Sequence, residues 1–301
     1  MIAARGLALL LCALPCTTAC RETSEAKAAQ LREVEATRKQ ELARRIALAD
    51  ANPTRRAPLA MWIMPPELKE ISGLALKPDG RVLTHGDEVG IISEVDPKSG
   101  FILKRFVLDG EPHGDFEGIT IAGTDVYLLE SNGKLFKFRE GADGAHVPFT
   151  EYDTRLGKEC EFESVAFEPD SSRLLMACKR VATKSLKDQL VIYRVQLPIS
   201  NSARPTMLAV PMDVVVGANL WKHFHPSDMA IDPTTGNYVL IASEEKALAV
   251  ITPDGTVVRS EPLPAHHNQA EGVAVTKDSI LIVSDEATQK PAAITLYRWR
   301  P

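Results

Sequence analysis

The sequence predicts an all-β fold, a five-bladed β-propeller of four-stranded blades that is closed by an N-terminal strand and preceded by a helical segment. Three observations predict it. A short motif recurs five times, each copy is followed by apolar runs separated by turns, and the last unit lacks a strand while a spare one precedes the first. Propellers are built in this way, from small sheets repeated around a ring.

The repeated motif begins with a polar residue, has Ser or Glu two places later, and ends in an apolar alternation. Its copies are Glu70–Leu76, Asp115–Ile121, Glu161–Phe167, His225–Ile231 and Gln269–Val275. They recur about every 45 residues, the length of one blade. One interval is longer because of an excursion near Pro198–Pro205. We expect this excursion to be a long loop rather than a sixth blade.

In each of the first four units, the motif is followed by three further apolar runs. In the first unit they are Val82–His85, Ile91–Val95 and Ile102–Leu108. With the motif itself they make the four antiparallel strands of a blade, and we expect the motif strand to lie innermost, against the axis.

The fifth unit ends after Ile294–Trp299, one strand short. The run Leu59–Met64, just before the first motif, is the strand left over. Pairing these two runs would close the ring and remove an open sheet edge, which β-proteins avoid. The sequence therefore predicts that residues 57–301 form one propeller.

The first residues have the pattern of an export signal. Arg5 precedes the apolar run Leu7–Leu14, and small residues then lead to Cys20. The segment resembles a bacterial lipoprotein signal, residues 1–19, in which Cys20 becomes the lipidated first residue. Thr17 departs from that pattern, so plain secretion with cleavage nearby is the alternative. Arg21, directly after the cysteine and in place of Asp, resembles the arrangement in lipoproteins that are sent on to the outer membrane. The resemblance implies a lipid anchor in the cell envelope, on the periplasmic face of the outer membrane.

Residues 20–56 are predicted to form a helical tether. From Glu22 to Asp50 the chain is rich in strong helix formers and has neither Gly nor Pro. Leu31, Val34, Leu42 and Ile46 form only a thin apolar stripe, so we expect a solvated helix. Pro53 ends it, because a residue before proline avoids helical angles.

Two cysteines, Cys160 and Cys178, remain in the predicted propeller. If Phe162–Phe167 and Leu174–Cys178 pair as a hairpin, both cysteines lie near its open end. In an oxidising compartment a disulfide then becomes possible. Two buried free thiols are the alternative.

The composition limits the possible partners. The formal net charge is -5, with no dense block of Lys and Arg, so no nucleic-acid partner is expected. The chain has no Gly-x-Ser-x-Gly elbow, no phosphate-binding Gly-rich loop and no Cys-x-x-Cys pair. Serine nucleophile catalysis and nucleotide binding therefore lack support.

Six carboxylates and one histidine at the first and third motif positions are predicted metal ligands. In a regular strand these positions share one face, which we expect to line the axial funnel. The predicted ligands are Glu70, Asp115, Glu117, Glu161, Glu163, His225 and Glu271. Crowded carboxylates raise one another's pKa until protons or a cation relieve them. Oxygen donors favour Ca²⁺ or Mg²⁺, with calcium the first choice. A solvated funnel mouth and a catalytic role are the alternatives.

Further polar residues are expected at the same mouth, mostly where second strands end. Gln269, Lys179, Glu130 and Asp285 are predicted ligand-binding residues. Lys179 either holds an anionic group or neutralises Glu161 and Glu163, and neutralisation is the preferred interpretation. His223 and His225 form a His-x-His pair without a clear third metal ligand, and the pair His266-His267 is expected in a polar loop.

The motifs Glu70–Gly73, Asp115–Gly118, His225–Asp232 and Gln269–Gly272 resemble those of the SdiA-regulated (YjiK/CarP-like) family of exported bacterial propellers. The likeness covers about Trp62 to the end, and Ser164 departs from it where glycine is usual. It implies a β-propeller, export, and association with calcium or another divalent cation.

The preferred hypothesis is a non-enzymatic envelope lipoprotein that binds a divalent cation in its funnel, together with a small ligand or an envelope protein. A metal-dependent hydrolase of phosphate or other small esters is the alternative. The third hypothesis is a purely scaffolding role without metal.

Overall fold

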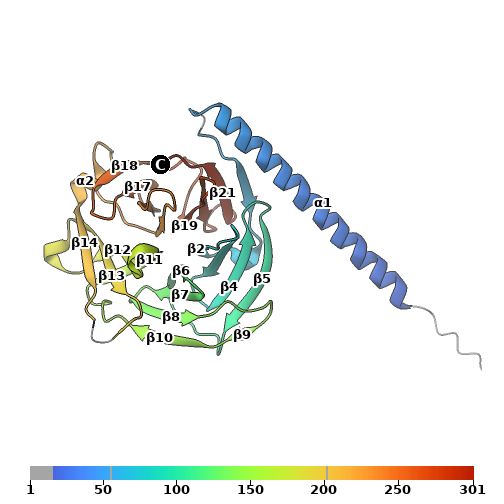
Figure 1. The fold of residues 1–301 in the computed structure, drawn as a ribbon, viewed down its shortest axis with the longest axis horizontal. Coiled ribbons are helices and arrows are strands. Elements are labelled where there is room, and N and C mark those ends of the chain that lie inside the picture. The colour runs from blue at the N-terminus through green and yellow to red at the C-terminus, as the bar shows by residue number, and fades with distance from the viewer. Residues whose placement is uncertain (1–15, 55, 201–202) are drawn as a thin grey trace, which may run out of the picture.

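A computed structural model describes residues 16–54, 56–200 and 203–301. Five four-stranded blades surround one axis, and helix α1 (Cys16–Ala51) runs along the outside of the ring and beyond it (Figure 1). The predicted signal, residues 1–19, falls mostly outside the described residues, and of Cys20 only its place in α1 is described. Among the described residues, no helix combines the length and apolarity needed to cross a membrane.

From the axis outward, blade 1 consists of β2 (Ile71–Leu76), β3 (Val82–Gly86), β4 (Ile91–Asp96) and β5 (Phe101–Leu108), with the short parallel strand β9 (His146–Val147) at its edge. Blade 2 consists of β6 (Phe116–Ala122), β7 (Asp125–Glu130), β8 (Lys134–Phe138) and β10 (Phe149–Asp153). Blade 3 consists of β11 (Cys160–Glu168), β12 (Arg173–Val181), β13 (Gln189–Gln196) and β14 (Thr206–Pro211). Blade 4, which follows the short helix α2 (Met212–Val216), consists of β15 (Asp228–Ile231), β16 (Tyr238–Ala242), β17 (Ala247–Ile251) and β18 (Val257–Pro262).

Blade 5 closes the ring with strands from both ends of the propeller. It consists of β19 (Ala270–Val275), β20 (Ile280–Asp285), β21 (Ala293–Arg298) and, outermost, β1 (Ala60–Ile63). Strand β1 pairs antiparallel with β21, and Trp62 lies opposite Ile294. The predicted five-bladed fold and its closure by an N-terminal strand are therefore confirmed.

The hydrophobic core lies in the spaces between neighbouring blades. Between blades 4 and 5, for example, Ile241, Val273 and Val283 are fully buried in one apolar cluster. These β-branched side chains suit a pleated surface that is covered on both faces. The blades are therefore wedged against one another, and the motif strands are held around the axis.

The second half of α1 packs against the propeller, which corrects the expectation of a solvated helix. Leu42 and Ala49 are 4% and 5% exposed within the core cluster that includes β1. The guanidinium of Arg38 donates to the carbonyl of Ser99 at 2.6 Å. Arg300 donates to the carbonyl of Ala49 at 2.8 Å. The long side chains hold the helix by covering apolar surface with their stems while their charged ends find partners.

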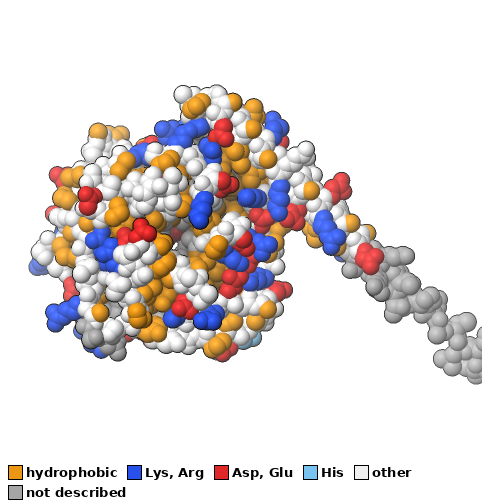
Figure 2. Space-filling view, in the orientation of Figure 1, with side chains coloured by type: hydrophobic (Ala, Val, Ile, Leu, Met, Phe, Trp, Pro, Cys, Tyr) orange, Lys and Arg blue, Asp and Glu red, His pale blue; other side chains and the backbone are white. Residues whose placement is uncertain are grey.

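The first half of α1 leaves the ring. Leu31 and Val34 are 57% and 38% exposed. Figure 2 shows acidic and basic side chains interspersed along this part of the helix. The expectation of solvation is met here, over residues 25–37.

Candidate cation site at the acidic mouth

The five inner strands, β2, β6, β11, β15 and β19, run in the same direction along the axis, so the two mouths of the propeller differ. The strands begin at a mouth rich in carboxylates and end at an apolar one. The apolar mouth is a cavity of about 220 Å³, and its lining includes Leu76, Ile121, Phe167, Ile231 and Val275. The alternating apolar end of each motif thus forms one mouth, and its polar start forms the other.

The third motif position carries a β-bulge in three blades. Residues on either side of Glu117, Glu163 and Glu271 are paired with the second strand, but the glutamates themselves are the extra residue. A bulge bends the strand and re-aims the inserted side chain. The simple alternation expected from a regular strand therefore does not apply at this position.

These three glutamates form a semi-buried acidic ring around one lysine. Lys179 Nζ lies 2.9 Å from Glu163 Oε1, and Glu163 is 3% exposed. Burial, helped by the charges of Glu163 and Asp115, raises the pKa of Glu117 to about 9. Burial and Glu163 raise the pKa of Glu271 to about 7. Burial works against the charge of Lys179, yet the carboxylates around it raise its pKa.

One ammonium group thus faces three carboxylates, and the excess negative charge is relieved by protons. A divalent cation could take their place, because it also neutralises the charge. The geometry supports the interpretation that Lys179 neutralises carboxylates, with Glu163 rather than Glu161 as its direct partner.

A disulfide holds the hairpin that carries part of this ring. Cys160 and Cys178 are bonded, with their Cα atoms 5.6 Å apart. Cys160 lies three residues before Glu163, and Cys178 directly precedes Lys179. The bond therefore ties together the two strand ends that present the ion pair.

The first motif positions lie at the outer rim of the mouth and have local partners. Glu70 pairs with Lys69 at 2.8 Å. Asp115 accepts from Ser131 Oγ at 2.6 Å, and the exposed Glu161 pairs with Arg180 at 3.3 Å. Gln269 donates to Glu286. First and third positions therefore form two levels, a solvated rim and a semi-buried ring.

The two other predicted ligand-binding residues have different surroundings. Glu130 is half-buried and accepts from the side-chain amide of Asn132 at 2.9 Å. Asp285 is 8% exposed, and both of its carboxylate oxygens are used, one by His267 and the other by the backbone N–H of Asn268. Both oxygens of Asp285 are therefore engaged by the loop before β19.

Below the acidic ring the channel narrows to a waist formed by the fourth motif position. At Gly118 an added Cβ would lie 2.8 Å from the backbone nitrogen of Val165, so no side chain fits there. In blade 4 this position is Asp228, whose Oδ2 accepts from the backbone N–H of Val273 at 2.7 Å and, more weakly, of Leu74 at 3.4 Å. Burial raises the pKa of Asp228 well above its usual value. Its carboxyl group bridges three blades at the waist.

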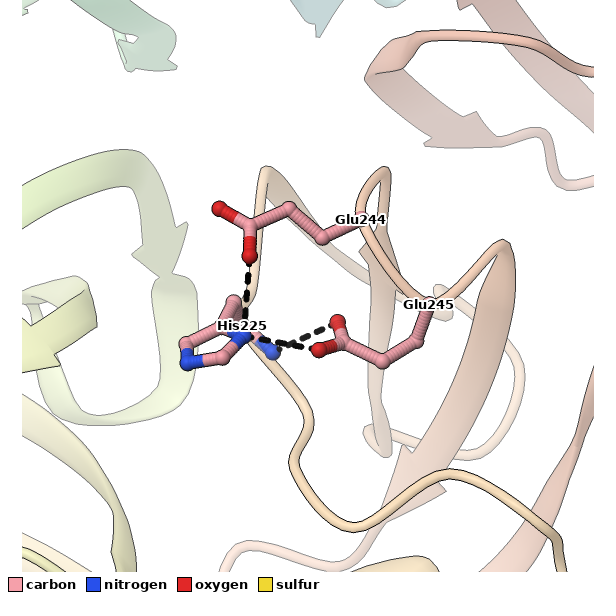
Figure 3. Close-up of side chains that lie close together, drawn as sticks. All are labelled: His225, Glu244 and Glu245. Carbon is pink, nitrogen blue, oxygen red and sulfur yellow. Dashed lines mark hydrogen bonds and ion pairs between the residues drawn. The ribbon is translucent and has the colours of Figure 1, made fainter.

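His225 forms the tightest group of metal-type donors at the rim (Figure 3). Its Nδ1 lies 2.7 Å from Glu245 Oε1 and 3.3 Å from Glu244 Oε2. One potential donor atom from each residue lies within 4.8 Å of the others, and among the described residues no other set of His, Cys, Asp and Glu does so. The hydrogen bond to Glu245 raises the pKa of His225. Figure 3 shows the second ring nitrogen pointing away from both carboxylates.

Sequence reasoning placed His225 at the mouth but missed both of its acidic partners as ligands. Glu244 and Glu245 lie in the turn after β16, outside the repeated motif. The available signal was a double carboxylate at the end of a second strand, but Asp87-Glu88 after β3 and Asp285-Glu286 at the end of β20 share it, so it does not single out this strand. The other six predicted metal ligands do not join this group.

Comparison with solved structures shows the same kind of fold. The chain is similar to the PQQ-bound aldose sugar dehydrogenase of Streptomyces coelicolor, with a TM-score of 0.55 and 14% identity over 81% of this chain and 98% of that one. It is also similar to glutaminyl cyclase from Myxococcus xanthus, with a TM-score of 0.50 and 13% identity over 80% and 95% of the two chains. None of the curated proteins matches the chain. A protein-family model described as SdiA-regulated matches residues 62–286.

Proposed function

The chain belongs to the SdiA-regulated family, and from this membership we propose that it is an envelope protein that binds a divalent cation at the acidic mouth of its propeller. The bound cation in turn holds a small anionic ligand or a carboxylate of an envelope protein. The group of His225, Glu244 and Glu245 carries this proposal.

The spacing of this group suits a metal ion. A metal bound at about 2.0–2.2 Å by nitrogen and carboxylate oxygen holds neighbouring donor atoms about 3 Å apart. The Nδ1 atom of His225 already lies 2.7 and 3.3 Å from its two carboxylates. The proton between His225 and Glu245 would leave when the ion enters. An imidazole donor favours Zn²⁺ at the rim, whereas the all-oxygen ring of Glu117, Glu163 and Glu271 favours Ca²⁺.

Calorimetric titration of the purified protein with Ca²⁺, Mg²⁺, Mn²⁺ and Zn²⁺ at pH 8 tests the proposal. We expect Glu245→Gln to weaken binding at the rim at least tenfold. We expect Glu117→Gln combined with Glu163→Gln to abolish binding in the ring. Glu151→Gln is the matched control, because Glu151 is an exposed carboxylate on the outer strand β10. Absence of binding by all four ions would overturn the proposal.

One observation favours the hydrolase alternative. The rim group offers three protein donors and lies at the solvent edge, with Glu244 exposed. Catalytic metal sites characteristically leave a coordination position open for water, whereas structural sites are closed. Turnover of p-nitrophenyl phosphate or acetate by the metal-loaded protein, lost in Glu245→Gln, would establish hydrolysis. Binding without turnover would leave the non-enzymatic function.

The location belongs to the same proposal. Export, a lipid on Cys20 and a position on the periplasmic face of the outer membrane agree with the signal-like start of the chain. A Cys20→Ser variant is expected to move from the membrane fraction to the soluble fraction. If it stays with the membrane, the lipid anchor at Cys20 is wrong.

A further inference from the structure

The loop between β18 and β19 holds a cluster of donors that the repeat motif does not predict. His266 and His267 lie side by side in it, with ring centroids 4.4 Å apart and planes 33° apart. His267 is 1% exposed, whereas His266 is half-buried. The sequence predicted a polar loop for this pair, but the loop folds back into the space between blades 4 and 5.

Both histidines contact one tyrosine. The Nε2 atoms of His266 and His267 each lie 2.6 Å from the hydroxyl oxygen of Tyr297, which comes from β21. On the other side of its ring, Nδ1 of His267 lies 2.6 Å from Asp285 Oδ2. The second oxygen of Asp285 accepts from the N–H of Asn268 at 3.2 Å. Two imidazole nitrogens thus converge on one hydroxyl oxygen.

Counting protons shows how the cluster is held together. The tyrosine hydroxyl has one hydrogen to donate, and neutral imidazole has one N–H. If Nδ1 of His267 donates to Asp285, its Nε2 must accept from Tyr297. Nε2 of His266 then donates to the tyrosine oxygen. The three donor atoms are held by two shared protons, and a metal ion can displace such protons.

We propose that His266, His267 and Tyr297 form a binding site for a transition-metal ion such as Cu²⁺ or Zn²⁺, with Asp285 as the residue that orients His267. Imidazole nitrogens suit both metals. A carboxylate on the far nitrogen of a metal-binding histidine is the usual arrangement around protein-bound metals, and it fixes the ring and the tautomer.

Binding changes the protonation of the cluster in a defined way. His266 moves its hydrogen from Nε2 to Nδ1, which frees the Nε2 lone pair for the metal. Tyr297 loses its hydroxyl proton to solvent and binds as phenolate. One proton is therefore released for each ion bound. Burial raises the pKa of Tyr297, so the charge of the metal is needed to ionise it and binding weakens as pH falls.

The site has room to adjust, and a cavity lies beside it. Donor atoms 2.6 Å apart must separate to about 3 Å around a metal with bonds of about 2.0 Å. His266 allows this movement, since it is half-buried in a loop. A cavity of about 140 Å³ lies next to Tyr297, and its lining also includes Leu263 and Pro264, which precede the two histidines in the chain.

Titration of the purified protein with Cu²⁺, followed by visible absorbance and calorimetry, tests this site. A phenolate bound to Cu²⁺ gives a ligand-to-metal charge-transfer band, which the rim group around His225 cannot give. We expect the band in the wild-type protein, its loss in Tyr297→Phe, and at least tenfold weaker binding in His266→Gln. Asp285→Asn should weaken binding about 10–100-fold. His225→Gln should keep the band, which separates this site from the proposed rim site.

Circular dichroism and thermal unfolding check that each variant is folded, and the half-buried His266 is the safer position if Tyr297→Phe is unstable. Failure of the folded wild-type protein to bind Cu²⁺ with the charge-transfer band would overturn the proposal. So would a band that survives both Tyr297→Phe and His266→Gln.

Discussion

Glu117 makes stability depend on pH. Its pKa is about 9 in the folded protein, through burial and the charges of Glu163 and Asp115, against an ordinary value of 4.5. Between these values the folded protein keeps a proton that the unfolded chain has lost. Below about pH 4.5 this group therefore costs no stability. As pH rises from 4.5 towards 9, the free energy of unfolding falls.

Replacing Glu117 by Gln removes this dependence. We expect Glu117→Gln to raise the melting temperature at pH 8 by roughly 2–8 °C, and to have little effect near pH 4. Thermal unfolding at both pH values measures the difference. Glu151→Gln, at an exposed site, should leave both melting temperatures unchanged. If Glu117→Gln is no more stable than the wild type at pH 8, the raised pKa of Glu117 is wrong.

The repeated motif was enough to locate the acidic ring. Glu117, Glu163 and Glu271 were predicted at the mouth because they share one motif position. Glu245 was not, since it lies in a turn outside the motif. Nor was Tyr297, whose side chain reaches His267 across the space between two blades. A repeat reveals residues that occur once in each blade, whereas contacts between blades depend on packing.

Among the elements, α1 departs most from what the sequence indicated. Its helical state follows from composition, but its docking follows from Leu42, Ala49 and the stems of basic side chains, which a hydrophobicity pattern counts as polar. The bulges of β6, β11 and β19 were equally hidden, because a one-residue insertion leaves the apolar alternation nearly intact.

The docking of α1 predicts a contrast between two leucines. Leu42 is 4% exposed and Leu31 is 57% exposed. Leu42→Ala should weaken docking by about 2–5 kcal/mol and speed amide hydrogen exchange along residues 38–50. Leu31→Ala is the matched control and should change neither. Equal exchange in the two variants would mean that the helix is not held by its buried face.

The closed ring is a property of the whole molecule. Strand β1 covers the edge of β21, which would otherwise be an open strand. A chain starting at residue 57 should unfold in one cooperative transition, as the blades are wedged together. A chain starting at residue 65 lacks β1, and we expect it to lose that cooperativity and to aggregate. Calorimetry and light scattering compare the two. Identical unfolding of both chains would show that β1 is dispensable.

If a lipid on Cys20 anchors the protein, the docking of α1 sets how far the acidic mouth lies from the membrane. With a rise of 1.5 Å per residue, the helix from Cys20, the proposed site of the lipid, to its first firm contact at Arg38 spans roughly 27 Å. When a surface holds the N-terminal end of this helix and the helix points away from that surface, the propeller lies several Debye lengths from the surface. The Debye length is about 8 Å at physiological salt. Charges on such a surface are screened at this distance. The mouth would then equilibrate with the bulk ion concentration rather than with the ion-enriched layer next to a charged membrane.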